Sequence, residues 1–146
     1  MKEAIARFEL VLATAPRKLV DISEADAGHK SGPDRWSKKE IIGHLIDSAG
    51  NNHQRFVRCQ FTPLLEFPEY DQNPWVACQA YAIEPWPDLV NLWLLLNRHL
   101  LHIVKAAPAE MHEHQLKIGH HNPMRFDALV ASYLQHMEHH LAQIYS

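Results

Sequence analysis

The apolar residues of this chain recur at helical spacing in four long stretches, and this periodicity limits its fold more than any other feature. No stretch alternates convincingly in the manner of a β-strand. Four helices of about 15–21 residues joined by loops predict an all-α four-helix bundle, with residues 1–146 forming a single domain. The expected helices cover residues 2–15, 37–58, 87–105 and 125–145. Pro16 should end the first helix or start a short second piece that runs through Ile22.

The second helix has the clearest start signal. Ser37 and Glu40 have the spacing of a capping box, and Trp36 and Ile41 can form a hydrophobic staple across it. A line of polar residues borders the apolar stripe of this helix instead of opposing it, which is typical of the wall of a cleft. This line consists of His44, Asp47, Asn51 and Arg55.

Three connections separate the helices. Residues 23–35 are rich in Gly, Asp, Ser and Pro, which predicts a loop. Residues 61–87 contain five prolines, and we expect a short helix near Trp75–Ala80 and aromatic side chains that cover one end of the bundle. Residues 106–124 form the last connection. The third helix is apolar nearly all round, which either a dimer interface or the long loop folded over it would explain.

Two histidines lie one helical turn apart near the end of the chain. His136 and His140 have the i, i+4 spacing that places two imidazoles on one helix face, where both can bind one metal ion. With roughly 100° per residue and Leu129 as the origin, both fall within about 20° of the edge of the apolar stripe. His139 falls about 80° outside it, and we expect it to be exposed or to support a ligand. His44, on a separate helix, is the best candidate for a third ligand.

The spacing alone leaves an alternative open. The chain has 12 histidines in 146 residues, so about one such pair would arise by chance, and three ordinary helix histidines with satisfied hydrogen bonds would look the same. We expect the other candidates to be surface residues. These are His99, His102, His112, His114, His120 and His121.

Composition excludes several classes of function. The net charge of −3 gives no basic face for nucleic acid, and no apolar run is long enough to span a membrane. Cys59 and Cys78 have no metal or redox spacing, which favours a reducing compartment, by default the cytoplasm. Glu3, Arg7 and Glu9 interrupt the beginning of the chain, so no apolar signal core is present.

Three segments together resemble the DinB-like, or YfiT-like, superfamily. Residues 36–48 (WSKKEIIGHLIDS) resemble its second-helix signature, residues 136–144 (HMEHHLAQI) its closing signature, and residues 70–76 (YDQNPWV) one of its loop elements. The resemblance implies an up-down-down-up four-helix bundle with a metal site made by His44, His136 and His140. It implies nickel or zinc as the metal and a homodimer as the assembly.

The resemblance also implies an activity. Several members are thiol S-transferases that join a low-molecular-weight thiol such as bacillithiol or mycothiol to an electrophile, and they include a mycothiol-dependent maleylpyruvate isomerase. A metal ion with open positions makes a bound thiol or a bound water more acidic. The ligand set therefore leaves two further possibilities, a metal-dependent hydrolase and a non-enzymatic, stress-linked interaction protein. We expect a small-molecule substrate in both enzymatic cases.

Histidines that bind a metal usually donate their second N–H to an acceptor. Asp47, one turn from His44, is expected to orient an imidazole or line the cleft, and a plain surface carboxylate is the alternative. Glu138 and Gln143 flank the other two histidines. Tyr133 could donate to a bound anion, although a core position suits a tyrosine at this place better.

Overall fold

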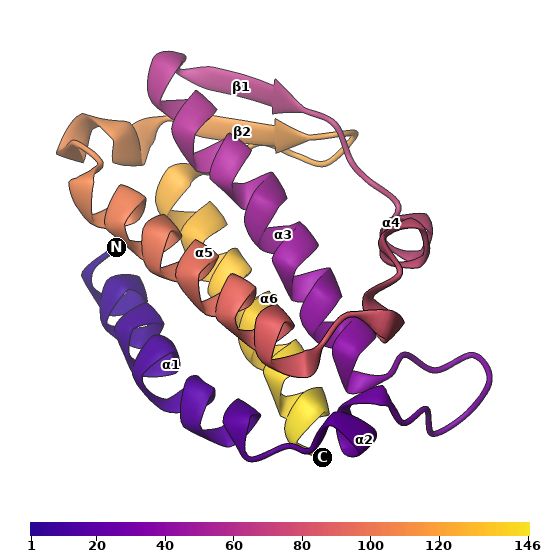
Figure 1. Cartoon of the computed structure of the whole chain (residues 1–146). Coiled ribbons are helices and arrows are strands. Elements are labelled where there is room, and N and C mark those ends of the chain that lie inside the picture. The colour runs from indigo at the N-terminus through magenta and orange to yellow at the C-terminus, as the bar shows by residue number, and fades with distance from the viewer.

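The computed structural model describes all 146 residues and contains the four long helices that the periodicity predicts. They are α1 (Lys2–Val20), α3 (Lys38–Arg58), α5 (Trp86–Ala106) and α6 (Phe126–Tyr145). α3 packs against α5 and α6, and α1 packs against the same two helices from the other side (Figure 1). The core between them is filled by large buried side chains, which include Phe8, Phe56, Trp93 and Phe126.

Two contacts give the direction of each helix. The indole Nε1 of Trp86, at the start of α5, donates to the carbonyl oxygen of Leu19 at the end of α1 (2.9 Å). The ammonium group of Lys38, at the start of α3, donates to the carbonyl oxygen of Ile144 at the end of α6. α3 and α5 therefore begin where α1 and α6 end. The bundle has the up-down-down-up order, and the long crossover between α3 and α5 carries the elements that border the site (Figure 1).

The start of α3 is held as the sequence predicts. The hydroxyl oxygen of Ser37 accepts from the backbone N–H of Glu40, and the Glu40 carboxylate accepts from the backbone N–H of Ser37 at 2.8 Å. Next to this cap, the buried ammonium group of Lys39 forms an ion pair with Glu24. The second oxygen of Glu24 accepts from the backbone N–H of Trp86 (2.9 Å), so one carboxylate joins α3 to α5.

Two expectations for the N-terminal third were wrong. α1 continues through Pro16 to Val20, because the extension buries Leu19 completely and proline removes only one backbone donor. Residues 23–35 are not all loop, since they contain α2 (Glu24–Gly28), whose first turn is capped by the Ser23 hydroxyl.

The expectation that the chain has no strand was also wrong. β1 (Leu64–Phe67) pairs in parallel with β2 (Gln115–Ile118), which pairs in antiparallel fashion with β3 (Met124–Arg125). The small sheet lies across the end of the bundle where α3 finishes and α6 begins (Figure 1). The expected short helix in the long connection is present as α4 (Gln72–Gln79). Single turns of 3₁₀ helix complete the connections at Cys59–Phe61, Tyr81–Ile83 and Ala109–Glu113.

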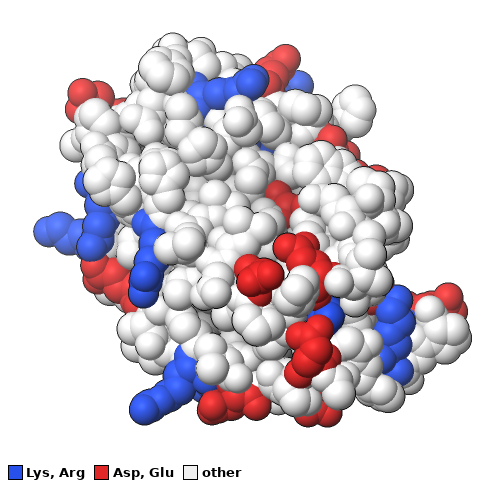
Figure 2. Space-filling view, in the orientation of Figure 1, with Lys and Arg blue, Asp and Glu red and all other residues white.

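The outer face of α5 stays uncovered in the single chain. Leu92 and Leu95 are 46% and 62% exposed, so the long connection does not fold over them. On the face drawn in Figure 2, basic and acidic side chains are interspersed and no large basic patch is visible. None of the helices has the length and the apolar character that crossing a membrane requires.

Candidate metal centre

His44 is held inside the bundle by its neighbours. The residue lies in the second turn of α3 and is only 2% exposed. The Trp36 ring packs beside its imidazole, with 5.2 Å between the ring centroids. A Cβ atom on the adjacent Gly43 would lie 2.1 Å from the Tyr81 ring, so only glycine allows that ring to pack against this turn. His44 therefore lies in a closely packed part of the bundle.

α6 presents the other two imidazoles one above the other. The rings of His136 and His140 have centroids 4.6 Å apart, and both residues are half-buried. Met137 and Leu141, on the adjoining stripe, are buried in the core. This arrangement confirms the helical-wheel position at the edge of the apolar face.

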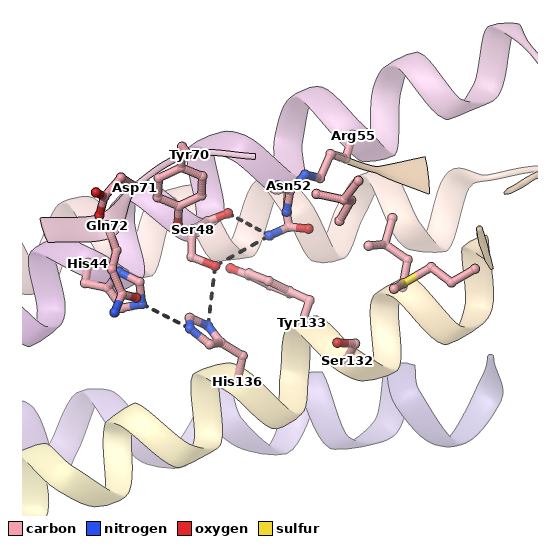
Figure 3. Close-up of a pocket in the computed structure, with 13 residues that line it drawn as sticks. His44, Ser48, Asn52, Arg55, Tyr70, Asp71, Gln72, Ser132, Tyr133 and His136 are labelled. Carbon is pink, nitrogen blue, oxygen red and sulfur yellow. Dashed lines mark hydrogen bonds between the residues drawn. The ribbon is translucent and has the colours of Figure 1, made fainter. Parts of the chain in front are cut away.

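The three imidazoles converge as predicted. Nε2 of His44 lies 3.0 Å from Nε2 of His136, and the ring of His44 is 4.7 Å from that of His140 between centroids. One ring nitrogen from each residue lies within 4.8 Å of the others. Figure 3 shows His44 and His136 facing each other from α3 and α6. Two nitrogens that bind one zinc ion at 2.0–2.1 Å are themselves about 3 Å apart, so the spacing suits a shared transition metal.

The electrostatics of the cluster favour neutral rings. Burial lowers the pKa of His44 to about 3 and that of His136 to about 4, and repulsion between the imidazoles adds to both shifts. Burial also lowers the pKa of His140, against a hydrogen bond to Gln143 that raises it. At neutral pH all three rings are uncharged, and this is the form in which imidazole binds a metal.

Gln143 orients His140. Its side-chain oxygen lies 2.8 Å from Nδ1 of His140, and its amide nitrogen lies 3.1 Å from Nε2 of the exposed His139. With Nδ1–H of His140 donating to that oxygen, Nε2 keeps its lone pair free. His139 therefore contacts the side chain that orients His140, in agreement with the expectation of an exposed or supporting residue.

Asp47 and Glu138 do not orient any histidine of the cluster. The Asp47 carboxylate is buried and accepts from the Tyr81 hydroxyl (2.7 Å) and from the Gln79 amide (2.6 Å), so it fastens α4 to α3 without contacting an imidazole. The expectation that it orients a histidine was wrong, because its side chain leaves α3 on the side that faces Tyr81. Glu138 forms an ion pair with Arg7.

Tyr133 is a core residue. Its hydroxyl donates to the side-chain oxygen of the fully buried Asn97 at 2.5 Å, whose amide in turn donates to the carbonyl oxygen of Trp93 (2.8 Å). The hydroxyl hydrogen is used within the core, in agreement with the expected core position. The side chain also lines the cleft beside His136, so its donation to a bound anion stays a prediction.

A cleft of about 410 Å³ opens between α3, α6 and the connections, and His44 and His136 line one end of it. Several of its polar residues were not predicted to line a cleft, although residues 70–72 belong to the loop element that resembles the superfamily. They are Ser48, Asn52, Tyr70, Asp71, Gln72 and Ser132. Ser48 and Asn52 follow His44 at intervals of four residues, so a shift of the polar line by one position would have found them. The Ser48 hydroxyl lies 3.5 Å from Nδ1 of His136 (Figure 3).

A second hollow of about 650 Å³ reaches the cluster at His140. His140 and Gln143 line it together with Trp36, and Gln72 borders both hollows. The histidine cluster can therefore be approached from two directions.

The remaining histidine candidates lie outside the cluster. His99, His102, His120 and His121 are exposed, as expected. His112 and His114 are half-buried, and Nδ1 of His114 lies 2.8 Å from the carbonyl oxygen of Cys59 at the end of α3, so these two are more enclosed than expected.

The fold and the cluster define a four-helix-bundle protein with three histidines close enough together to hold one metal ion. The model of the DinB superfamily matches residues 7–144 of this sequence. The chain therefore belongs to the DinB superfamily, as its three sequence segments indicate.

Two of the proteins similar to this chain carry names from metal-dependent chemistry, and a third is named for its dependence on mycothiol. A protein of Halalkalibacterium halodurans, named provisionally as a metal-dependent hydrolase, is 24% identical over 141 residues, which cover 91% of this chain and 80% of the relative. YfiT from Bacillus subtilis, described as a probable metal-dependent hydrolase with an unusual four-helix bundle topology, superposes with a TM-score of 0.84 at 16% identity over 98% of this chain and 82% of its own. A mycothiol-dependent maleylpyruvate isomerase superposes with a TM-score of 0.81 at 15% identity, over 98% of this chain and 60% of its own.

Proposed function

We propose that this chain is a metal-dependent enzyme that acts on small molecules, with a divalent transition metal held by His44, His136 and His140. We propose further that it transfers a low-molecular-weight thiol, such as bacillithiol, to an electrophile. The observation that carries the proposal is the convergence of three neutral imidazoles at a point that two hollows reach. Imidazole ligands favour zinc or nickel over magnesium or calcium.

The donor set suits such an ion. Three neutral ligands leave the charge of a divalent ion uncompensated, and three positions of a coordination sphere leave room for a further ligand. When bound, the ion would supply Lewis acidity that lowers the pKa of a thiol or a water. The protein's own contribution is to hold the rings uncharged through burial and to orient His140 through Gln143.

The two hollows favour transfer between two substrates over reaction with water alone. His44 lines the cleft and His140 lines the second hollow, and Gln72 lies at the border of the two. A thiol and an electrophile could therefore approach the same centre from opposite sides. The open cleft at the histidines also argues against a purely structural bundle, which needs no access to them.

Hydrolysis is the second candidate. The similar proteins from Halalkalibacterium halodurans and Bacillus subtilis are both named as metal-dependent hydrolases, and the same ligand set would activate water. A hydrolase needs no thiol, so the two reactions are separated by the requirement for one.

Two further proposals concern the setting of the enzyme. The exposed Leu92 and Leu95 on α5 support a homodimer through that face. The two cysteines are not paired, Cys59 being buried and Cys78 exposed, which supports a cytoplasmic location.

The first test is metal content. Untagged protein purified without chelators should contain about one zinc or nickel ion per chain by elemental analysis, and His136→Ala should lower this at least tenfold. The matched control is His120→Ala, which removes an exposed histidine outside the cluster and should leave the metal content unchanged. Equal metal in wild type and His136→Ala would overturn the proposed site.

The second test separates the reactions. Metal-loaded protein is incubated with bacillithiol and a panel of epoxides and alkyl halides, and separately with activated esters and amides without thiol. Thiol-dependent turnover that is lost in His44→Ala supports transfer. Turnover of esters or amides without thiol supports the hydrolase, and no turnover in either assay counts against both.

A further inference from the structure

Arg55 is a buried cation without a partner. The residue lies near the end of α3 and is only 8% exposed. It takes part in none of the ion pairs of the structure, and its Nε is fully enclosed without a hydrogen-bond partner. Its guanidinium lies over the face of the Phe67 ring, with Cζ 5.2 Å from the ring centroid. Buried charges are usually paired, so an unpaired guanidinium calls for an explanation.

The guanidinium lines the same cleft as the histidine cluster. His44 and Arg55 are 11 residues apart on one helix, so their backbones are separated by about 16 Å along α3. Figure 3 shows them at opposite ends of the group of lining residues, with Ser48 and Asn52 between them on α3. A small molecule in this cleft could reach Arg55 at one end while its other end lies at the three imidazoles.

No group of the protein neutralises Arg55 in the cleft. Asp71 is the only carboxylate among the lining residues, and its Oδ1 accepts from the backbone N–H of Asn73 at the start of α4. It does not lie within ion-pair distance of Arg55, and Figure 3 shows it near the His44 end. Burial lowers the pKa of the Arg55 guanidinium, but an arginine side chain stays charged at neutral pH.

The other residues that line the cleft limit the kind of anion that can bind at Arg55. Arg55 is the only Lys or Arg that lines it, and the apolar residues Ile118, Met124 and Leu129 line it as well. One planar guanidinium matches one carboxylate through two parallel hydrogen bonds, whereas a phosphate dianion would need more positive charge. The apolar lining suits an uncharged carbon skeleton between the acid and the reacting group.

We propose that Arg55 forms a carboxylate-binding subsite, so that the substrate of this cleft is a small acid whose carboxylate lies at Arg55 while its reactive end lies at the histidine cluster. This inference rests on the proposed function, because it names the substrate class of the same cleft. Arg55 acts in it as a specificity-determining residue and takes no part in bond making.

The experiment uses metal-free protein, so that it does not depend on the metal site. Hexanoate and hexanamide, which have the same chain and differ in charge, are titrated at pH 7.5 while the Nε–H signal of Arg55 is followed by NMR. That signal is assigned by its absence in Arg55→Lys. Hexanoate should shift it in a saturable way and bind at least tenfold more tightly than hexanamide, and inorganic phosphate should bind more weakly than hexanoate.

Two variants make the result specific. Arg55→Gln should remove the preference for hexanoate. Arg58→Gln, one turn farther along α3, removes an exposed arginine whose Nε donates only to Gln54 and should keep the preference unchanged. Circular dichroism confirms that each variant is folded. An equal affinity for hexanoate and hexanamide in the wild type, or a preference that survives in Arg55→Gln, overturns the subsite, and tighter binding of phosphate overturns its assignment to carboxylates.

A second arm joins the subsite to the metal. In cobalt-loaded protein, 6-mercaptohexanoate should bind at least tenfold more tightly than 6-mercaptohexanol, as measured by the sulfur-to-cobalt absorption band, and Arg55→Gln should remove the difference. If cobalt does not bind, the metal proposal fails while the metal-free titration still decides the subsite. If the band forms with equal affinity for both thiols, the carboxylate inference fails and the metal site stands.

Discussion

α3 carries two buried cations, and they are treated in opposite ways. Lys39, in the first turn, is 5% exposed, and its ammonium group is paired with Glu24, which also accepts from the backbone of α5. Arg55, near the last turn, is 8% exposed and has no carboxylate partner. Both side chains are almost completely removed from water, so burial alone does not distinguish their roles.

The difference separates residues that hold the fold from residues that face the cleft. Four buried side-chain atoms lack a hydrogen-bond partner. Nδ1 of His44 and Nε of Arg55 belong to residues that line the cleft, whereas Oδ2 of Asp47 and Nε1 of Trp93 do not. Around Lys39 the polar groups are satisfied by each other, as in the Ser37 and Glu40 cap. An unpaired buried polar group is costly in a folded protein, so those that line a cleft are candidates for contact with a ligand. The first turns of α3 thus stabilise the bundle, and the cleft face is prepared for binding.

The largest effect on stability is expected at the first turn of α3, where Lys39 is paired with Glu24. Lys39→Ala should lower the free energy of unfolding by about 2–3 kcal/mol, because it removes the ion pair and the packing of a buried alkyl chain. Urea denaturation followed by circular dichroism measures it. Lys117→Ala, which breaks the exposed pair with Glu66, is the control and should change stability by less than about 0.5 kcal/mol. A similar loss in both variants would remove the distinction drawn for Lys39.

The cleft face should respond to pH. In metal-free protein the pKa values of His44 and His136 are about 3 and about 4, below the value near 6.5 expected in the unfolded chain. Between these values the unfolded state binds more protons, so stability is fully present above pH 6.5 and is lost as pH falls. Going from pH 7 to pH 4.5 should remove about 2 kcal/mol, allowing for partial exposure of the cluster.

Urea midpoints measured across this range in the presence of a chelator test the pH dependence. His136→Gln should flatten the curve, since it removes one of the two shifted groups and the repulsion it exerts on the other. An unchanged curve in that variant would mean that the loss of stability arises elsewhere in the chain.

The long helices were predictable because their apolar periodicity extends over four or more turns. The strands were not, since β1 and β2 have only four residues each and pair across about 50 residues of sequence, so neither shows a pattern of its own. The expectation that the first helix ends at Pro16 was wrong for a related reason. Its local effect ends helices, and the burial of Leu19 that keeps α1 going is visible only in the packed bundle.

The metal cluster was predictable to different degrees. His136 and His140 follow from spacing on one helix. His44 was a candidate from its place on a separate helix, and the family resemblance supported it, because no local pattern shows which faces of two helices meet. The predicted polar line on α3 is correct at its two ends, since His44 and Arg55 line the cleft. Between them the cleft is lined by Ser48 and Asn52, each one position after the predicted residue. Successive steps of three and four residues keep close to one helical direction, and the sequence could not show that Asp47 turns toward Tyr81 while Ser48 faces the cleft.

The smallest effect on stability is expected near the last turn of α3, where Arg55 has no carboxylate partner, and it discriminates best between the two ends of the helix. Arg55→Met keeps a long side chain and removes a buried charge without a partner, so it should leave the free energy of unfolding unchanged or raise it by up to about 1 kcal/mol. The contact of the guanidinium with Phe67 limits the gain, since that attraction is lost. Urea denaturation beside Lys39→Ala measures the contrast directly. A loss at Arg55 as large as at Lys39 would show that the guanidinium holds the fold, and the division of α3 into a structural end and a binding end would then have to be abandoned.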